Sequence, residues 1–530
     1  MPRGSILTEI PVPTQGARSD VPRHRLPPDA MSADDAANVV IRDGWLVNRP
    51  GFSAINSTLV SGRPMGVTLF KTGASSKFLV VGTTTKLYKL NGAQTGWDDL
   101  TGPTALTGSA DDPISFTVFP QGGSDYLIAA NGVNVPQEWD GVAGTFVDSG
   151  TLPVADDLTT AANRVLLLRT IESGTRYNFR VRWSNFNVRG TSDSANFADL
   201  SDTPDILVGG RALSRVQVAI YKEASQWIGV AQSGSQPFRF DLRDSMPGPV
   251  SPAAVVVADG RHYYMGRDGS FYTFDGVRGF HIGEPIRRWV LANLNMSKLR
   301  RCFGVYLRRD RDIYWIFPAP TTDDPAVAVS YNLDTGRFFR HSLAFSVSCG
   351  ADWEMRAALT WADLAGYTWA TVAATYPTWS SFGTASIPVA VLGGTNLTVF
   401  QFGIAATDDG TAPTATWRSL LPLHAKSKRA RIQSMESYFE QTAAALTVTV
   451  NLQTQDHVAT APTTPTGLST TFDISQNALF AFDVDTAAAG AGSGTAEARF
   501  AALQHSVTST INWKWGGAVL RSYPMETGNA

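Results

Sequence analysis

The sequence predicts an all-β protein, an irregular β-propeller with an additional C-terminal β-sandwich domain and an extended N-terminal arm. Glycine and proline are plentiful, at 47 and 29 of 530 residues, and long Leu/Lys/Glu-rich stretches are missing, which favours short strands and turns over helices. A strand ending in Asn-Gly or Asp-Gly recurs irregularly through the middle of the chain. From about residue 400 onward, strands follow one another without these marked turns.

The N-terminal arm and first strand are predicted to span residues 1–52. The stretch "PVPTQGARSDVPRHRLPPDAMSADDAANVV" is polar and interrupted by proline, and it has neither a strand nor a helix period. Such a segment cannot build a core, so we expect it to be ordered only where a neighbouring subunit or ring holds it. "VIRDGWLVNRPGF" then gives a short strand, a turn and an Arg-Pro-Gly corner.

The recurring unit is an apolar strand, a tight turn and a second strand that ends in a marked dipeptide. A two-residue type I′ turn requires positive φ at both central positions, which Asn, Asp and Gly tolerate best. We therefore predict that each unit is a hairpin closed by such a turn, as at Asp275-Gly276. The four clearest units end in "KLYKLNG", "PQEWDG", "GSFYTFDG" and "SYNLDTG".

Repeats of about 40 to 50 residues, each with a few antiparallel strands, are typical of β-propeller blades. Residues 60 to about 390 would accommodate about six to eight such blades, and residues 53–395 are predicted as a β-propeller-like domain. The alternative is a large irregular β-sandwich, since the spacing is too uneven for a WD40 or kelch repeat. The aspartate-box pattern of sialidase propellers is also missing from the sequence.

Residues 396–530 are predicted as a separate C-terminal β-sandwich domain. Apolar and polar residues alternate in "LTVTVNLQT" and in "INWKWGGAVLRSY", which indicates strands with one buried face. The Ala-Gly-rich stretch "TAAAGAGSGTAEAR" lies between the two. A compact sandwich of about 120 residues fits these lengths.

Composition limits the possible functions. The 44 basic and 46 acidic residues leave a formal net charge of -2, which gives no indication that nucleic acid is the main partner. Cys302 and Cys349 are too few for a disulfide framework or a metal cage, and we predict reduced core residues of a chain folded in a cytoplasm. No apolar run has signal-peptide length or approaches the ~18 residues of a membrane span. We therefore expect no export and no membrane anchor.

The sequence contains no recognisable catalytic pattern. HExxH, GxSxG, CxxC and Walker motifs are missing, and none of the seven histidines pairs with another at i,i+4. We therefore expect no catalytic residues, no metal and no cofactor. "GAGSG" at 490–494 follows no apolar strand and is predicted to be a flexible loop. The paired aspartates of "SADDPIS" (109–115) and "TTDDPAV" (321–327) could serve glycoside hydrolysis, but Asp-Asp-Pro favours a turn between strands.

Two basic clusters could contact a phosphate backbone or a neighbouring subunit. "KLRRCFGVYLRRDRDIYWIF" places arginines between two aromatic strands, where a solvated hairpin tip is the simplest interpretation, and "HAKSKRARIQ" places its charges before a strand. Surface charge or salt bridges between subunits are the favoured role of both clusters. The candidate subunit or DNA-channel contacts are Arg308, Arg309, Arg311, Lys426, Lys428, Arg429 and Arg431.

Four stretches together resemble the tail nozzle proteins, also called hub or tubular proteins, of short-tailed bacteriophages. In "NVVIRDGWLVNRPGF", residues Asn38 to Phe52 match an Asn-x5-Gly-x-Leu-x2-Arg-x-Gly pattern. The others are "GRDGSFYTFDGVRGFHIGEPIRRWVLANLN", "YNLDTGRFFRHS" and the strand pair around Trp513 and Trp515. The resemblance spans most of the chain except the long middle stretch "SNFNVRGTSDSANFADLSDTPD".

The resemblance implies a structural virion protein without enzymatic activity. It would form a ring, commonly a homohexamer, that is part of the conduit for genome ejection and a platform for other tail proteins. The implied partners are other copies of the chain, the adaptor (head-to-tail connector) above, tail fibre, spike or needle proteins, and viral DNA in passage. The implied location is the virion tail, assembled in the cytoplasm of the host bacterium.

Two other functions remain open at this stage. A β-propeller enzyme that degrades host polysaccharide would need a carboxylate cluster at the mouth of the propeller, and the sequence predicts none. A carbohydrate-binding adhesin of the tail tip would use exposed aromatic residues. We expect the protein not to cleave host lipopolysaccharide or capsule.

Overall fold

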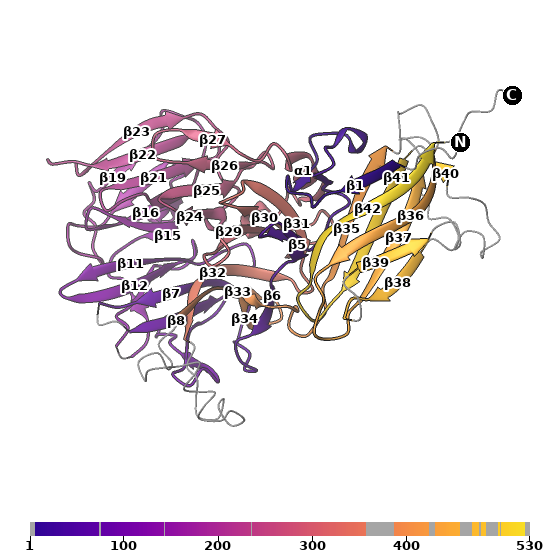
Figure 1. Ribbon diagram of the computed structural model, residues 1–530. Coiled ribbons are helices and arrows are strands. Elements are labelled where there is room, and N and C mark those ends of the chain that lie inside the picture. Colours follow the sequence, from indigo (N-terminus) through magenta and orange to yellow (C-terminus); the bar gives the residue numbers. More distant parts are fainter. Residues whose placement is uncertain are drawn as a thin grey trace.

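The computed structural model describes most of the chain and leaves eleven segments aside. The described residues are 6–73, 76–142, 144–234, 236–356, 386–422, 430–455, 469–475, 479–483, 497–498 and 500–524. The loop predicted at 490–494 lies outside them. Within them the structure is almost entirely β, which confirms the predicted class (Figure 1). The few helices in the described part of the chain are α1 (Arg287–Asn293) and the short 3-10 turns η1 (Arg23–Arg25), η2 (Pro252–Ala254) and η3 (Leu299–Arg301).

Seven antiparallel sheets, here numbered 1 to 7, follow one another along the chain. Sheets 1 to 3 contain β7 (Pro64–Lys71), β8 (Lys77–Thr83), β9 (Leu87–Leu90) and β10 (Trp97–Asp99); β11 (Ser115–Gln121), β12 (Ser124–Ala130), β13 (Gln137–Trp139) and β14 (Val147–Asp148); and β15 (Val154–Ala161), β16 (Arg164–Glu172), β18 (Arg180–Trp183) and β19 (Phe197–Asp199), with β17 (Thr175–Arg176) beside β16.

Sheets 4 to 7 repeat this order, and the last sheet takes its fourth strand from the start of the chain. They contain β20 (Leu207–Ala212), β21 (Gln217–Lys222), β22 (Gln226–Ala231) and β23 (Phe238–Asp244); β24 (Val255–Ala258), β25 (Arg261–Met265), β26 (Phe271–Phe274) and β27 (Gly279–His281); β28 (Phe303–Leu307), β29 (Asp312–Pro318), β30 (Pro325–Asn332) and β31 (Arg337–Ser342); and β32 (Val347–Arg356), β33 (Ser386–Gly394), β34 (Val399–Ala405) and β6 (Gly51–Ala54).

The seven sheets form a circle because each one packs on the next through a buried apolar cluster. Phe119 and Leu158 belong to the cluster between sheets 2 and 3, and others of the same kind lie between the following sheets. Val391 of sheet 7 and Val81 of sheet 1 share a further cluster, so the last sheet meets the first. The first strands also pack on one another, and β32 contacts β7. This circular order is what the β-propeller prediction requires.

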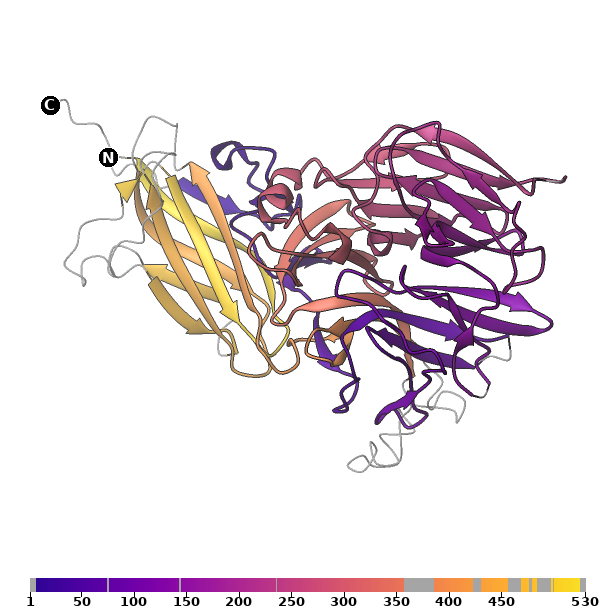
Figure 2. The same cartoon turned by 180° about the vertical axis from the view of Figure 1, so that it is seen from behind.

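Two further sheets form a unit beside the circle (Figure 2). The seven-stranded sheet contains β39 (Leu479–Asp483), β36 (Ala430–Phe439), β42 (Lys514–Pro524), β5 (Trp45–Asn48) and β4 (Val39–Arg42), with β1 (Ile6–Ile10) on β42 and β40 (Glu497–Ala498) on β36. The four-stranded sheet contains β35 (Thr414–Pro422), β41 (Phe500–Thr508), β37 (Thr447–Gln455) and β38 (Ser469–Asp473).

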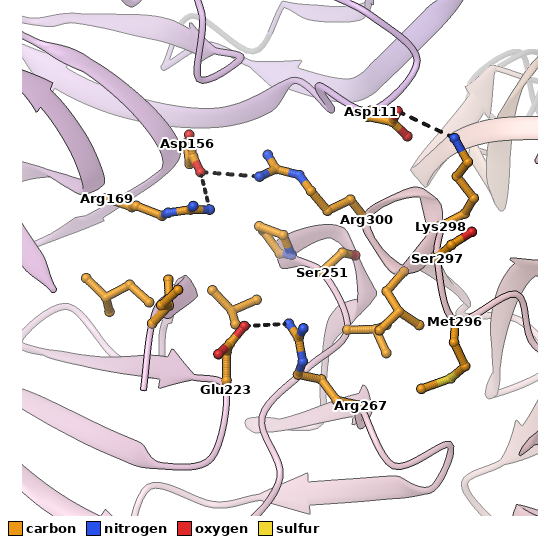
Figure 3. A pocket seen from close by; sticks show the side chains of 16 residues that line it. Asp111, Asp156, Arg169, Glu223, Ser251, Arg267, Met296, Ser297, Lys298 and Arg300 are labelled. Carbon is orange, nitrogen blue, oxygen red and sulfur yellow. Dashed lines mark hydrogen bonds and ion pairs between the residues drawn. The ribbon is translucent and has the colours of Figure 1, made fainter. Parts of the chain in front are cut away.

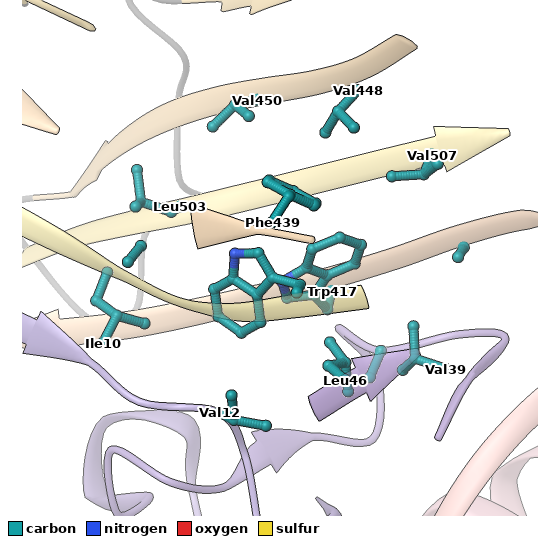
Figure 4. Close-up of a cluster of buried hydrophobic side chains, with 14 of the residues drawn as sticks. Ile10, Val12, Val39, Leu46, Trp417, Phe439, Val448, Val450, Leu503 and Val507 are labelled. Atoms are coloured by element: carbon teal, nitrogen blue, oxygen red, sulfur yellow. The ribbon is translucent and has the colours of Figure 1, made fainter. Parts of the chain in front are cut away.

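The two sheets of this unit share one apolar core (Figure 4). Trp417 of β35 stacks on His505 of β41, with ring centroids 4.7 Å apart, and on Trp513 at 5.0 Å. The Trp515 indole N–H donates to the Ser437 hydroxyl oxygen at 2.8 Å. Burial lowers the pKa of His505 to about 3, so the ring is neutral at physiological pH and packs as an aromatic residue.

The N-terminal segment is not the free arm that the sequence suggests. β1 pairs with β42, and β4 and β5 extend the same sheet, while β6 completes sheet 7. Between them β2 (Ala17–Arg18) pairs in parallel with β3 (Met31–Ser32), and Ala17 and Ala33 are buried against sheets 5 and 6. The expectation that a neighbouring subunit must order this segment is therefore wrong, because strand pairing and burial within its own chain hold it.

The predicted boundary between residues 395 and 396 also needs correction. It falls between β33 and β34, which pair with each other from Ala390 and Phe402 to Gly393 and Val399. Sheet 7 therefore continues to Ala405, and the two-sheet unit begins after it. The unit also includes β1, β4 and β5 from the segment predicted as 1–52.

The marked dipeptides occupy one equivalent place, the connection from the third to the fourth strand of sheets 1, 2, 5 and 6. The turn is not the predicted type I′. At Asp275, four residues separate the paired Phe274 and Gly279, and only Gly276 has positive φ (+92°). Asp275 Oδ1 instead accepts the backbone N–H groups of Val277 and Arg278, at 2.9 and 3.0 Å. An acidic or amide residue is therefore favoured in this loop, because its side-chain oxygen can accept hydrogen bonds from the backbone of the loop.

Type I′ geometry occurs at other hairpins. Arg42 pairs with Trp45 across Asp43 and Gly44, whose φ values are +50° and +81°. The connection from β24 to β25 has the same form at Asp259-Gly260, with φ of +49° and +73°. The preference of type I′ turns for Asp-Gly therefore applies at these two hairpins, because both central residues must adopt positive φ.

A buried ion pair connects the circle of sheets with the two-sheet unit. The Arg49 side chain, 0% exposed, lies between β5 and β6, and its Nη1 donates to Asp408 Oδ1 at 2.8 Å. Its Nε donates to Asn38 Oδ1 at 3.0 Å and its Nη2 to the Ser342 carbonyl at 2.9 Å. A side chain at Gly51 would place Cβ 2.1 Å from the Thr407 carbonyl oxygen. The junction is therefore closely packed and fully hydrogen-bonded.

Gly276→Val should destabilise the protein by about 1 to 3 kcal/mol, because a β-branched residue is strained at positive φ. Gly92→Val is the matched control, since Gly92 lies in the corresponding marked turn of sheet 1, lacks positive φ and has open space where its Cβ would stand. Chemical denaturation of both variants measures the difference. Equal losses would contradict the assignment of strain to Gly276.

Arg49→Met should destabilise the protein by about 3 to 5 kcal/mol, because Asp408 would remain buried without its partner. The double variant Arg49→Met, Asp408→Leu should recover much of this loss, since it removes the uncompensated charge as well. Thermal and chemical unfolding compare the three proteins. A single variant as stable as the unchanged chain would show that the pair does not stabilise the junction.

Candidate functional site

A cavity of about 340 Å³ opens at the amino-terminal ends of the first strands of sheets 2 to 6 (Figure 3). Its walls come from Asp156 at the start of β15, from residues 206–208 at the start of β20, from the residues before β24, and from the segment 296–300 before β28. These ends meet around the axis of the circle, so residues far apart in sequence line one space. This is the position at which sheets arranged in a circle gather polar loop residues.

Asp156 is the centre of the charged wall. Its side chain is 4% exposed, and three guanidinium groups surround it: Arg176 Nη1 at 2.5 Å, Arg169 Nη1 at 3.0 Å and Arg300 Nη1 at 3.5 Å. The three arginines come from β17, β16 and η3. One carboxylate thus balances one of three positive charges.

Arg169 has an uncommon backbone conformation. Its φ is +56° in the middle of β16, where the flanking Leu168 and Thr170 keep their pairing with β15. Its Nε donates to Asn178 Oδ1 at 3.2 Å, while Nη1 reaches Asp156. A non-glycine residue in this region carries strain, and such strain is concentrated at functional sites.

The two Asp-Asp-Pro motifs come together beside this cavity at Arg301. The Arg301 Nε donates to Asp111 Oδ1 at 2.6 Å, and its Nη1 donates to Asp324 Oδ1 at 3.1 Å. Lys298 Nζ lies 3.2 Å from Asp323. The hydrogen bond from Arg301 lowers the pKa of Asp111, so this carboxyl group is ionised at neutral pH.

An ionised Asp111 is poorly suited to act as the general acid of a glycosidase, which needs a raised pKa. Asp112 has the turn role that the sequence favours, since its Oδ2 accepts the Ser109 backbone N–H at 2.8 Å. The arrangement therefore makes each acidic turn an electrostatic anchor for a basic side chain.

The first predicted basic cluster lies at the other end of β28. Arg308, Arg309 and Arg311 form the tip of the β28–β29 hairpin, with side chains 55%, 54% and 41% exposed. Each pairs with an aspartate: Arg308 with Asp352, Arg309 with Asp310, and Arg311 with both Asp259 and Asp334. This placement agrees with the predicted solvated hairpin tip. Contact of these arginines with DNA or with a neighbouring subunit stays a prediction.

The second predicted basic cluster is only partly described. Lys426, Lys428 and Arg429 lie outside the described residues. Arg431 is exposed on β36, where its backbone pairs with Tyr523 of β42. It is remote from the cavity, in the two-sheet unit.

A second cavity, of about 390 Å³, follows the axis and is lined by residues of the first strands of sheets 1, 2, 4, 5, 6 and 7. Arg300 lines both cavities. Sequence reasoning missed Asp156, Arg169 and Arg176, because they lie in three different strands and none of them belongs to a recognisable motif. They are recognisable as a charged cluster only in the folded structure, where they lie side by side.

Metal and thiol chemistry find no support in the part of the chain that is described. No group of three or more His, Cys, Asp or Glu side chains there could hold a metal ion. Cys302 and Cys349 are buried and unpaired, as predicted, and burial raises the pKa of Cys349 to about 12. Across the described segments, no helix has both the length and the apolarity that crossing a membrane requires.

Comparison with known proteins gives no family. No protein-family model matches the chain, and no curated protein is similar to it. Among solved structures, the computationally designed Ika8 protein has a TM-score of 0.36 at 9% identity, covering 71% of this chain and 98% of its own. BamB from Moraxella catarrhalis has a TM-score of 0.35 at 10% identity, covering 75% and 98%. Likeness at this level carries no argument about function.

Asp156→Asn should destabilise the protein by about 2 kcal/mol, because three guanidinium groups would lose their shared acceptor charge. Asp98→Asn is the control, since its ion pair with Lys89 is long, at 3.7 Å, and half exposed, so that its loss should cost under about 1 kcal/mol. Denaturant unfolding measures both. Equal effects would mean that Asp156 does not hold the cationic wall.

Proposed function

We propose that this chain is a structural protein of a bacteriophage tail, a seven-bladed β-propeller with a C-terminal β-sandwich that assembles into the nozzle, or hub, ring. The observation that carries the proposal is the pattern from Asn38 to Phe52. Asn38 and Arg49 hydrogen-bond each other, and Gly51 fits where no side chain would. The residues of the resemblance therefore support the junction of the two parts, as expected of a motif that maintains a scaffold.

The proposed partners are other copies of the chain in a ring, commonly six, the adaptor above, and tail fibre, spike or needle proteins. Viral DNA would pass through the conduit of the stacked rings. The location is the virion tail. A polysaccharide-degrading enzyme is the weaker alternative, since the carboxylates beside the cavity are engaged by Arg301 and Lys298. An adhesin of the tail tip is the other.

The outer edge of β1 offers a surface for ring assembly. In the described chain β1 pairs only with β42, so its other edge presents free backbone groups. Ile6 and Leu7 are 45% and 58% exposed there. Apolar side chains on an open edge support association with a neighbouring subunit by strand addition.

Electron microscopy and sedimentation of the purified chain test the proposal. We expect a ring with a central hole, and Leu7→Lys should shift the population toward monomers by tenfold or more without changing the melting temperature. Val277→Lys changes an apolar residue of similar exposure, 69%, on sheet 5 and should leave assembly unchanged. A monomer under all conditions, or cleavage of host capsule by the purified chain, would overturn the proposal in favour of an adhesin or an enzyme.

A further inference from the structure

Arg300 has hydrogen-bonding capacity that its own chain does not use. Among the described residues its one acceptor is Asp156, at 3.5 Å, and its buried Nε has no hydrogen-bond partner there. A guanidinium group has five N–H donors in a planar fork. Buried donors are almost always satisfied, so this one requires an explanation. The side chain as a whole is 39% exposed, which leaves its fork accessible from the cavity.

The charge around Arg300 is also uncompensated. Arg169, Arg176 and Arg300 share the single carboxylate of Asp156. The other acidic groups of the wall have partners of their own, Glu223 with Arg267 at 3.1 Å and Asp111 with Arg301 at 2.6 Å. The three arginines therefore carry two more positive charges than the carboxylate that they share, in a partly enclosed space where electrostatic attraction is stronger than in water.

Part of the lining of the same cavity is apolar. Val208, Val250, Pro252, Met296 and Leu299 line it, and Met296 is 52% exposed at the cavity. A volume of about 340 Å³ lies at the lower end of the range for small-molecule sites. The combination of an apolar wall with a few convergent polar groups is typical of such sites.

We propose that this cavity binds a small organic anion, with its carboxylate or phosphate group on Arg300 and its short apolar body against Val250 and Leu299. The anion accepts the unused N–H groups of Arg300 and neutralises the excess charge beside Asp156. The strained backbone of Arg169 keeps a second guanidinium group at the same end before the ligand arrives. The site goes beyond the proposed tail function and would exist in each subunit independently of ring assembly.

Isothermal titration calorimetry with four probes tests the site. Hexanoate has both a carboxylate group and an apolar chain, and hexyl phosphate has a phosphate group in place of the carboxylate. Acetate has the carboxylate group without the chain, and hexanol has the chain without an anionic group. We expect hexanoate or hexyl phosphate to bind at least tenfold more tightly than acetate and hexanol, with affinity falling as salt concentration rises. Equal affinity for all four, or binding that ignores salt, would overturn the proposal.

Variants locate the binding. Arg300→Gln should weaken the better anion at least tenfold, whereas Arg239→Gln, which changes an arginine 64% exposed on β23, should leave it unchanged. If Arg300→Gln fails to fold, substitutions of the exposed Met296 test the site instead. Met296→Glu adds a negative charge and should weaken binding of the anion at least fivefold, whereas Met296→Lys adds a positive charge and should not weaken it. Undiminished binding by Arg300→Gln, or equal binding by the two Met296 variants, would place the anion elsewhere and refute the site.

Discussion

The buried pair of Arg49 and Asp408 is the constraint on which the arrangement of the two parts depends. A charge 0% exposed is tolerated only when its hydrogen-bonding groups are satisfied, and each Arg49 nitrogen has an acceptor. These acceptors belong to the first hairpin, to the end of sheet 6 and to the segment after sheet 7. Formation of the pair therefore requires that all three are in place. It fixes one relative position of the circle and the two-sheet unit.

The axial region shows a different use of charge. At the junction the Arg49 cation is paired and buried, while around Asp156 cations exceed anions and remain accessible. The first arrangement favours rigidity and the second favours a ligand. The Arg301 cluster lies between these cases, since it joins the segment before sheet 2 to the β29–β30 loop of sheet 6 across the mouth of the circle. The fold thus keeps the charges that stabilise the junction apart from the charges that are accessible to a ligand.

The hairpins were predictable because their signals are local. "GSFYTFDG" ends a third strand, as do the other marked units, although Asp275 acts by capping a four-residue loop instead of entering a type I′ turn. The strand β1 was not predictable, because its stability comes from distant partners such as Arg521, which pairs with Leu7. The site at Asp156 was hidden for a similar reason. Arg300 lies 144 residues away, and the basic cluster that contains it does not indicate a contact with Asp156.

The closure of sheet 7 by β6 also determines when the molecule is able to fold. Phe52 pairs with Phe402, and Ala54 with Phe400, so the outer strand is synthesised long before the strand that it joins. During translation the partly apolar β6 segment remains unpaired while the six intervening sheets are synthesised. Contacts between such distant residues are slow to form, because a large loop must close before they stabilise anything. The circle therefore closes only after β34 has been synthesised, and a chain truncated before residue 399 would leave an open sheet edge exposed to aggregation.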